Sequence, residues 1–70
     1  MKISARNVLS GKILAIVRGP VTTEITLEIA PGVQITSTIT STSAESLGLK
    51  EGAQAYGVIK ASSVMIGVDD

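Results

Sequence analysis

Two runs of alternating apolar and polar residues occupy the middle of the chain. In Val21–Ala30 the apolar side chains recur at every second position, and Val33–Thr40 repeats this alternation. A period of two places the apolar side chains of a strand on one face. The runs are separated by Pro31-Gly32, a residue pair typical of a tight turn. The pattern therefore predicts an antiparallel hairpin.

The run before this hairpin, Leu9–Arg18, carries apolar residues at both parities. A regular strand would hold them on two faces: Ile13, Ala15 and Val17 on one, Leu14 and Ile16 on the other. A strand that is apolar on both faces is expected to be covered on both. The core of the chain can cover one face, and we expect a second subunit to cover the other.

The hydrophobic period changes after Thr40. Thr42 and Glu45 have the spacing of a capping box, in which hydroxyl and carboxylate each accept from a free backbone amide. This spacing predicts one short helical turn over Ala44–Leu47, ended by Gly48.

Three further extended segments complete the prediction. They are a short strand or arm over Lys2–Asn7 and two strands over Gln54–Lys60 and Ser63–Val68. Short antiparallel strands at this spacing indicate an all-β fold, a small OB-like β-barrel that is closed or partly open. Residues 1–70 then form a single domain with one short helical turn.

The length and the missing residue types bear on how this domain is stabilised. A chain of 70 residues buries only about 60% of the surface of its unfolded form, which makes a lone domain marginally stable. Small domains compensate with disulfides, a structural metal or oligomerisation. Because the chain has no Cys and no His, disulfides and ordinary zinc sites are excluded. We therefore expect a homo-oligomer.

Charge and aromatic content argue against several functions. Six basic residues balance six acidic ones, and Tyr56 is the single aromatic residue, whereas nucleic-acid binders need positive charge and stacking platforms. No His can activate a Ser nucleophile, so we do not expect an enzyme. With no apolar run of membrane length and no signal peptide in view, we expect a cytoplasmic protein without membrane partners.

Fifteen Ser and Thr residues gather beside the few cations. Ser4 precedes Arg6 by two positions, and Lys60 is followed by Ala61-Ser62-Ser63. Hydroxyl, guanidinium, ammonium and backbone amide groups are all hydrogen-bond donors, and together they favour an oxyanion site. Two alternatives stay open: an ordinary solvated surface, or ion pairs across strands with the carboxylates of Glu24, Glu28 or Glu45.

Several segments resemble, in order, those of the Mop domain. They are Ser4-Ala5-Arg6-Asn7, Leu9–Ile13, Gly19–Glu24, Leu47-Gly48-Leu49 and Lys60-Ala61-Ser62-Ser63-Val64. The resemblance runs from Met1 to about Val68, and a free-standing Mop domain is similar to the molbindins, which are small cytoplasmic molybdate-binding proteins. It implies an OB-like barrel assembled as a hexamer, a trimer of dimers, that stores molybdate or tungstate between subunits without an organic cofactor.

The resemblance also implies which residues contact the oxyanion. The positions that match the family's contacts are Ser4, Arg6, Thr40, Ser43, Lys60, Ala61 and Ser62, with Gly19, Val21 and Thr22 in the turn as further contacts. The alternatives are an OB-type nucleic-acid-binding protein and a purely structural oligomerisation module.

Overall fold

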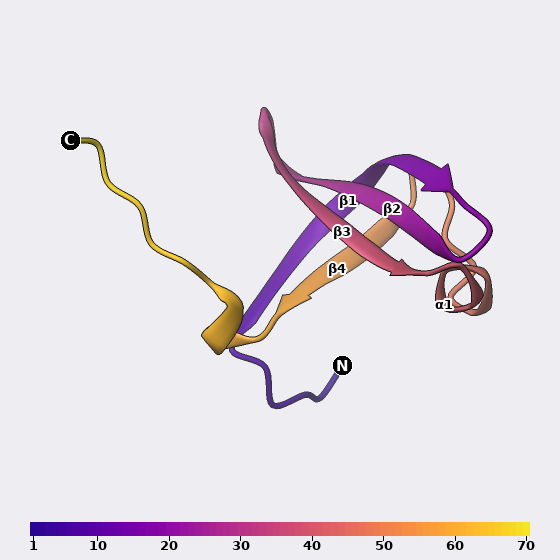
Figure 1. Ribbon diagram of the computed structural model, residues 1–70, viewed down its shortest axis with the longest axis horizontal. Helices are drawn as coiled ribbons and strands as arrows, with labels where there is room; N and C mark the ends of the chain where they lie inside the picture. Colours follow the sequence, from indigo (N-terminus) through magenta and orange to yellow (C-terminus); the bar gives the residue numbers. More distant parts are fainter.

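The computed structural model describes residues 1–70 as one curled antiparallel sheet with a short helix at one end (Figure 1). The elements are β1 (Asn7–Arg18), β2 (Thr22–Ala30), β3 (Val33–Thr40), α1 (Ser41–Ser46), β4 (Gln54–Ile59) and the 3₁₀ turn η1 (Ala61–Ser63). The four strands lie in the order β3-β2-β1-β4 and form a half-barrel. The predicted all-β, OB-like architecture is confirmed in this partly open form. Neither helix is long enough to cross a membrane.

The predicted hairpin is present as β2 and β3. Ile25 lies opposite Ser37 and Leu27 opposite Ile35, and both Ile25 and Leu27 are buried. Every second residue of β2 faces the core, as the alternation indicated.

β1 departs from the regular alternation that the sequence suggested. A register shift between Ile13 and Ala15 marks a β-bulge, which adds one residue and reverses the faces beyond it. Ile13 lies opposite Leu27 and Ile16 opposite Ile25, so both face the core, whereas Val17 is 63% exposed. The grouping of Ile13, Ala15 and Val17 on one face was therefore wrong. The second apolar face exists, but in the single chain it is uncovered.

The core is small. Ile13, Ile25 and Leu27 form its centre, and Leu49, from the loop after α1, packs against them together with five Ile and Ala side chains: Ile16, Ile29, Ile35, Ile39 and Ala55. Six of the 70 residues are buried, while fourteen large apolar side chains remain exposed. This imbalance agrees with the marginal stability expected of a lone chain.

The helix starts earlier than the capping-box spacing suggested. Thr40 is the N-cap, and its Oγ1 accepts a hydrogen bond from the backbone N–H of Ser43 at 3.1 Å. The prediction of Thr42 as the cap of a turn over Ala44–Leu47 was wrong because Thr40, the last residue of β3, takes that role. The predicted stop is confirmed: Gly48, just beyond the C-cap, has φ 64°, a conformation that glycine adopts at little cost.

Both ends of the chain lie outside the sheet. Residues 1–6 form an arm without regular secondary structure, and the sheet begins at Asn7. The strand predicted over Ser63–Val68 is wrong for the single chain: η1 ends at Ser63, and the residues after it carry no regular structure. A strand needs a neighbouring ladder, and no strand of this chain pairs with the segment.

A close approach of two strands predicts a difference between two glycine variants. A Cβ at Gly11 would lie 2.8 Å from the backbone oxygen of Glu28, whereas a Cβ at Gly57 would meet the flexible end of the Ile35 side chain. We expect Gly11→Ala to lower the free energy of unfolding by about 1–3 kcal/mol and Gly57→Ala by less. Urea denaturation at one fixed protein concentration measures both; an equal or larger loss in Gly57→Ala would contradict this packing.

Candidate functional site

The candidate site residues form two groups at opposite ends of the sheet. The first group lies where the chain enters β1 and leaves β4, close to η1, and the second surrounds the start of α1 (Figure 1). The first contains Ser4, Arg6, Lys60, Ala61 and Ser62. The second contains Thr40 and Ser43 together with Gly19, Val21 and Thr22. A single chain therefore does not bring all the predicted residues together.

The pairing of β1 with β4 creates the first group. The strands are antiparallel and place Asn7 opposite Ile59, so the residues before β1 and those after β4 leave the sheet at the same corner. The side chain of Asn7 fastens this corner by donating from Nδ2 to the Ile59 carbonyl at 3.3 Å. Arg6 and Lys60, 54 positions apart in the sequence, consequently line one groove of the same chain.

This groove, which we call the donor groove, has a volume of about 610 Å³. It is lined by Ile3, Ser4, Ala5, Arg6, Val58, Lys60, Ala61 and Ser62. Two of these side chains are cationic, two are hydroxyls and none is acidic. The polar lining is therefore rich in donors and has no carboxylate to repel an anion.

The carboxylates considered as ion-pair partners lie elsewhere. Glu28 is opposite Lys12 in the middle of β1, Glu24 is opposite Val17 near its far end, and Glu45 lines a separate cavity beside α1. Val17 is ten residues beyond Asn7, roughly 33 Å along a strand. The alternative in which Arg6 or Lys60 pairs with one of these carboxylates is therefore wrong for this chain.

The donor groove is open to solvent. Ser4, Arg6, Lys60 and Ser62 are all exposed. Its volume lies within the roughly 300–1,000 Å³ of pockets that hold drug-sized ligands, whereas a tetrahedral oxyanion has five atoms. One chain therefore supplies the donors but does not enclose a small anion.

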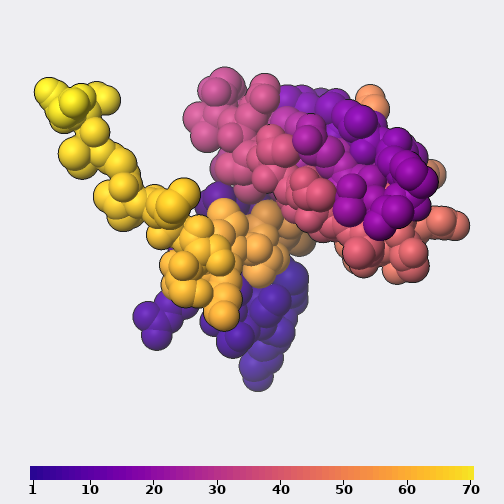
Figure 2. Space-filling model, in the orientation of Figure 1, coloured from indigo at the N-terminus to yellow at the C-terminus, as the bar shows by residue number.

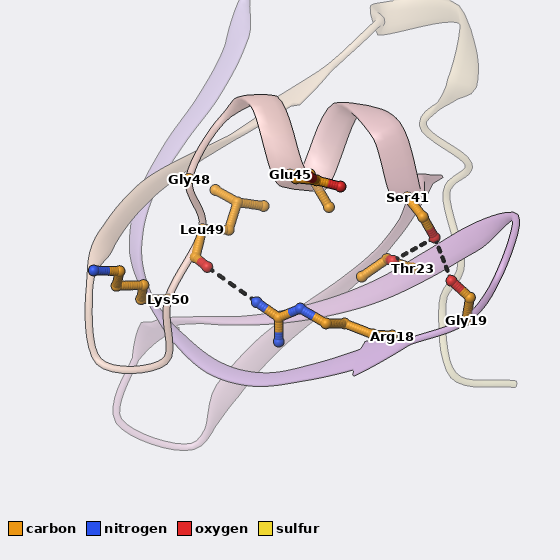
Figure 3. A pocket seen from close by; sticks show the side chains of 9 residues that line it. Arg18, Gly19, Thr23, Ser41, Glu45, Gly48, Leu49 and Lys50 are labelled. Atoms are coloured by element: carbon orange, nitrogen blue, oxygen red, sulfur yellow. Dashed lines mark hydrogen bonds between the residues drawn. The ribbon is translucent and has the colours of Figure 1, made fainter.

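The second group has its hydroxyls engaged within the chain. Thr40 Oγ1 donates to Ser43 Oγ at 2.8 Å while it caps the helix. Ser41, which no sequence pattern indicated, connects the turn before β2 to α1. Its hydroxyl donates to the Gly19 carbonyl at 2.6 Å and lies 2.8 Å from Thr23 Oγ1 (Figure 3). Its backbone N–H donates to the Val21 carbonyl.

A second cavity, of about 420 Å³, lies beside this group. Arg18, Glu45 and Lys50 bring charge to it, and Arg18 donates from Nη2 to the Leu49 carbonyl at 3.3 Å (Figure 3). If the alternation were regular from Ile13 onward, Arg18 would lie on the outer face of the sheet. Because of the bulge after Ile13, Arg18 lies opposite Thr23, on the same side of the sheet as the core. No sequence signal identified this position because the bulge has no evident signature. In this arrangement Arg18 attaches the loop after α1 to β1.

Comparison with known proteins supports the resemblance seen in the sequence. Residues 3–66 match the TOBE domain family. Molybdenum-pterin-binding protein 1 of Clostridium pasteurianum is 53% identical over 66 residues, which cover 94% of this chain and 97% of that protein. All residues of the donor groove lie within the family match.

Two solved structures have the same fold. MopII from Clostridium pasteurianum, in an apo form, superposes with a TM-score of 0.90 and 51% identity over 96% of this chain and 100% of that chain. The cytoplasmic molybdate-binding protein ModG, with molybdate bound, gives a TM-score of 0.91 and 46% identity over 99% of this chain and 49% of ModG.

The hydrogen bonds of Ser41 predict a structural role for its hydroxyl. Ser41→Ala would leave the hydroxyl of Thr23, a residue that is 1% exposed, and the Gly19 carbonyl without these partners. We expect a loss of about 1–3 kcal/mol in the free energy of unfolding. Thr42→Ala, at a neighbouring exposed position whose side chain makes no hydrogen bond, is the matched control. Thermal melting of both variants at the same concentration provides the test, and equal melting temperatures would contradict the assignment.

Proposed function

The chain belongs to the TOBE domain family, and we propose that it binds molybdate or tungstate for intracellular molybdenum storage or homeostasis. One observation carries this proposal: the donor groove joins two cations and two hydroxyls and has no carboxylate in its lining. A relative that matches nearly the whole chain is named as molybdenum-pterin-binding, and ModG holds molybdate. These relatives are binding proteins rather than enzymes.

In the proposed complex, the cationic side chains compensate the charge of the anion, and the hydroxyl and amide groups bind its oxygens. Arg6 and Lys60 offset the two negative charges, and the hydroxyls of Ser4 and Ser62 and the backbone N–H of Ala61 donate to its oxygens. Hydrogen bonds to an ionised partner are shorter and stronger than neutral ones. The ligand is held without chemical change, so neither a nucleophile nor an organic cofactor is required.

We propose further that the site lies between copies of the chain in a homo-oligomer, a hexamer built as a trimer of dimers. The open donor groove needs a cover, and exposed apolar side chains such as Val58 and Val8 adjoin it on the outer face of the sheet. Thr40, Ser43 and the Gly19–Thr22 turn lie at the other end of the chain. If they also contact the oxyanion, a second copy must bring them there.

Two other functions fit the chain less well. An OB-type nucleic-acid-binding protein would need stacking platforms, whereas the donor groove has no aromatic side chain and the net charge is zero. A purely structural module gives no reason for two cations to share a groove without acidic partners. The cytoplasmic location of ModG supports the same compartment for this protein.

The cations of the donor groove should matter more for the ligand than for folding. We expect Arg6→Gln or Lys60→Gln to weaken molybdate binding at least about tenfold, because a hydrogen bond to a charged group contributes roughly 1.5–3 kcal/mol and about 1.4 kcal/mol is a factor of ten. The ligand-free protein should melt at an unchanged or higher temperature, since one repelling cation is gone. Titration calorimetry and thermal melting measure the two effects.

Lys12→Gln is the matched control for these variants. Lys12 is also exposed, but it lies opposite Glu28 in the middle of β1 and lines neither cavity. Its substitution should leave molybdate affinity unchanged. If Lys12→Gln weakens binding while Lys60→Gln does not, the donor groove is the wrong site.

The donor-only lining also predicts selectivity among anions. Molybdate and tungstate are nearly equal in size and should bind with similar affinity, whereas smaller sulfate leaves the donors too far from its oxygens for good hydrogen bonds. Competition calorimetry tests the order of affinities, and equal affinity for sulfate would contradict the size argument.

The proposed assembly has its own test. Native mass spectrometry of the same samples measures the mass of the oligomer and the number of bound anions, and a monomer at micromolar concentration would contradict the proposed assembly.

A further inference from the structure

A side-chain hydrogen bond lies directly beside the two cations of the donor groove. Asn7 Nδ2 donates to the Ile59 carbonyl at 3.3 Å and joins the first residue of β1 to the last residue of β4. Arg6 precedes Asn7 and Lys60 follows Ile59, so each cation is one residue away from this bond. Figure 2 shows the N-terminal arm, in indigo, beside the orange-yellow residues that follow β4. The bond of Asn7 therefore connects the two halves of the groove.

Asn7 and the donor groove lie on opposite faces of the sheet. Exposure alternates along both strands: Asn7 and Ile59 are half-buried on the core side, whereas Val8 and Val58, which form the next pair, are exposed on the outer side. Val58 lines the groove and Asn7 does not. Asn7 is thus no contact of the ligand, and its influence on an anion has to pass through the backbone that it joins.

The strand pairing brings the two cations side by side. Asn7 and Ile59 are the last pair of the β1–β4 ladder, and Arg6 and Lys60 come one step beyond it. Lys60 keeps extended dihedral angles, φ −62° and ψ 130°, before η1 begins. Since the faces of a strand alternate at every residue, the alternation continues to the side of Val58, where the groove opens.

Two cations at such a place are hard to keep together. Like charges repel, and the end of a ladder opens more easily than its middle. No side chain that lines the groove makes a hydrogen bond within the chain. The amide of Asn7 is the side chain that links the two strands at this end and so opposes their separation.

We propose that Asn7 is a positioning residue of the donor groove. Through the Ile59 carbonyl, its amide keeps Arg6 and Lys60 side by side, so that both act on one oxyanion. The inference rests on the proposed function and names a residue outside the ligand contacts on which affinity depends. Asparagine suits this role because it donates without carrying a charge, whereas an ionised aspartate has no donor and would bring a carboxylate close to the anion.

Asn7→Leu removes the amide and keeps a side chain of similar size. We expect it to weaken molybdate binding about tenfold, the lower end of what a metal site loses when a hydrogen bond that orients its ligand is removed. The ligand-free protein should melt at nearly the same temperature, because an apolar side chain on the core side replaces one hydrogen bond at the end of the ladder.

Gln54→Leu is the matched control. Gln54 also donates its side-chain amide across the β1–β4 pair, to Ser10 Oγ, but at the end of the ladder that is far from the groove. This variant should leave molybdate affinity unchanged. Equal losses of affinity in Asn7→Leu and Gln54→Leu would overturn the inference, since any amide between the two strands would then have the same effect.

A double-mutant cycle separates positioning from a merely structural role. Lys60→Gln alone is expected to weaken molybdate binding at least about tenfold. In the Asn7→Leu background the same substitution should cost less than about threefold, because Lys60 is then already displaced from the anion and the two effects are not additive. Titration calorimetry of the four proteins measures the cycle, and an equal cost of Lys60→Gln in both backgrounds would overturn the inference.

Relaxation of ¹⁵N nuclei in the ligand-free protein tests the positioning without molybdate. The backbone order parameters of Arg6 and Lys60 should fall in Asn7→Leu and stay unchanged in Gln54→Leu. This measurement keeps the two proposals distinguishable. If the unsubstituted protein does not bind molybdate although the order parameters fall, the proposed function alone is contradicted. Intact molybdate binding with unchanged order parameters in Asn7→Leu would overturn the positioning role alone.

Discussion

A shortage of buried apolar surface governs this structure. The chain forms a half-barrel around a core cluster of only three buried aliphatic side chains, Ile13, Ile25 and Leu27, while fourteen large apolar residues stay exposed. Neither a disulfide nor a Cys- or His-bound metal can compensate, because the sequence has no Cys and no His. Oligomerisation is the remaining means by which small domains compensate for a small core. The exposed apolar side chains lie largely on the outer face of β1 and β4 and in residues 64–70.

The pairing of β1 with β4 explains why the donor groove forms where it does. The β1–β4 pairing brings both ends of the chain out at one corner, where the sheet no longer buries side chains. Arg6 and Lys60 meet there without a neighbouring carboxylate. The net charge of zero does not oppose anion binding, since the donors within a few ångströms of a ligand outweigh distant charges that solvent and salt screen. Cations gathered without acidic partners at an open corner favour an anionic ligand and a covering subunit together.

Part of the site was predictable from the sequence and part was not. Ser4 and Arg6 share a short segment, and Lys60, Ala61 and Ser62 are consecutive, so each half of the donor groove is visible as a local motif. Their meeting depends on the β1–β4 register, which residue composition does not encode. Thr40 and Ser43 were grouped with them through the family resemblance, yet in one chain they cap α1 at the opposite end. Arg18 and Ser41 were missed because their partners are brought close only by the bulge and by the turn before β2.

The sequence by itself determined the all-β class, the β2–β3 hairpin and the stop of the helix at Gly48, because alternation and turn residues act over a few neighbouring positions. Tertiary structure decided the bulge after Ile13, the N-cap at Thr40 and the unpaired state of residues 64–70. The physical reason is that each of these features depends on strand pairing. The bulge belongs to the ladder between β1 and β2, the N-cap lies where β3 stops pairing with β2 at Thr22, and residues 64–70 have no neighbouring strand in this chain.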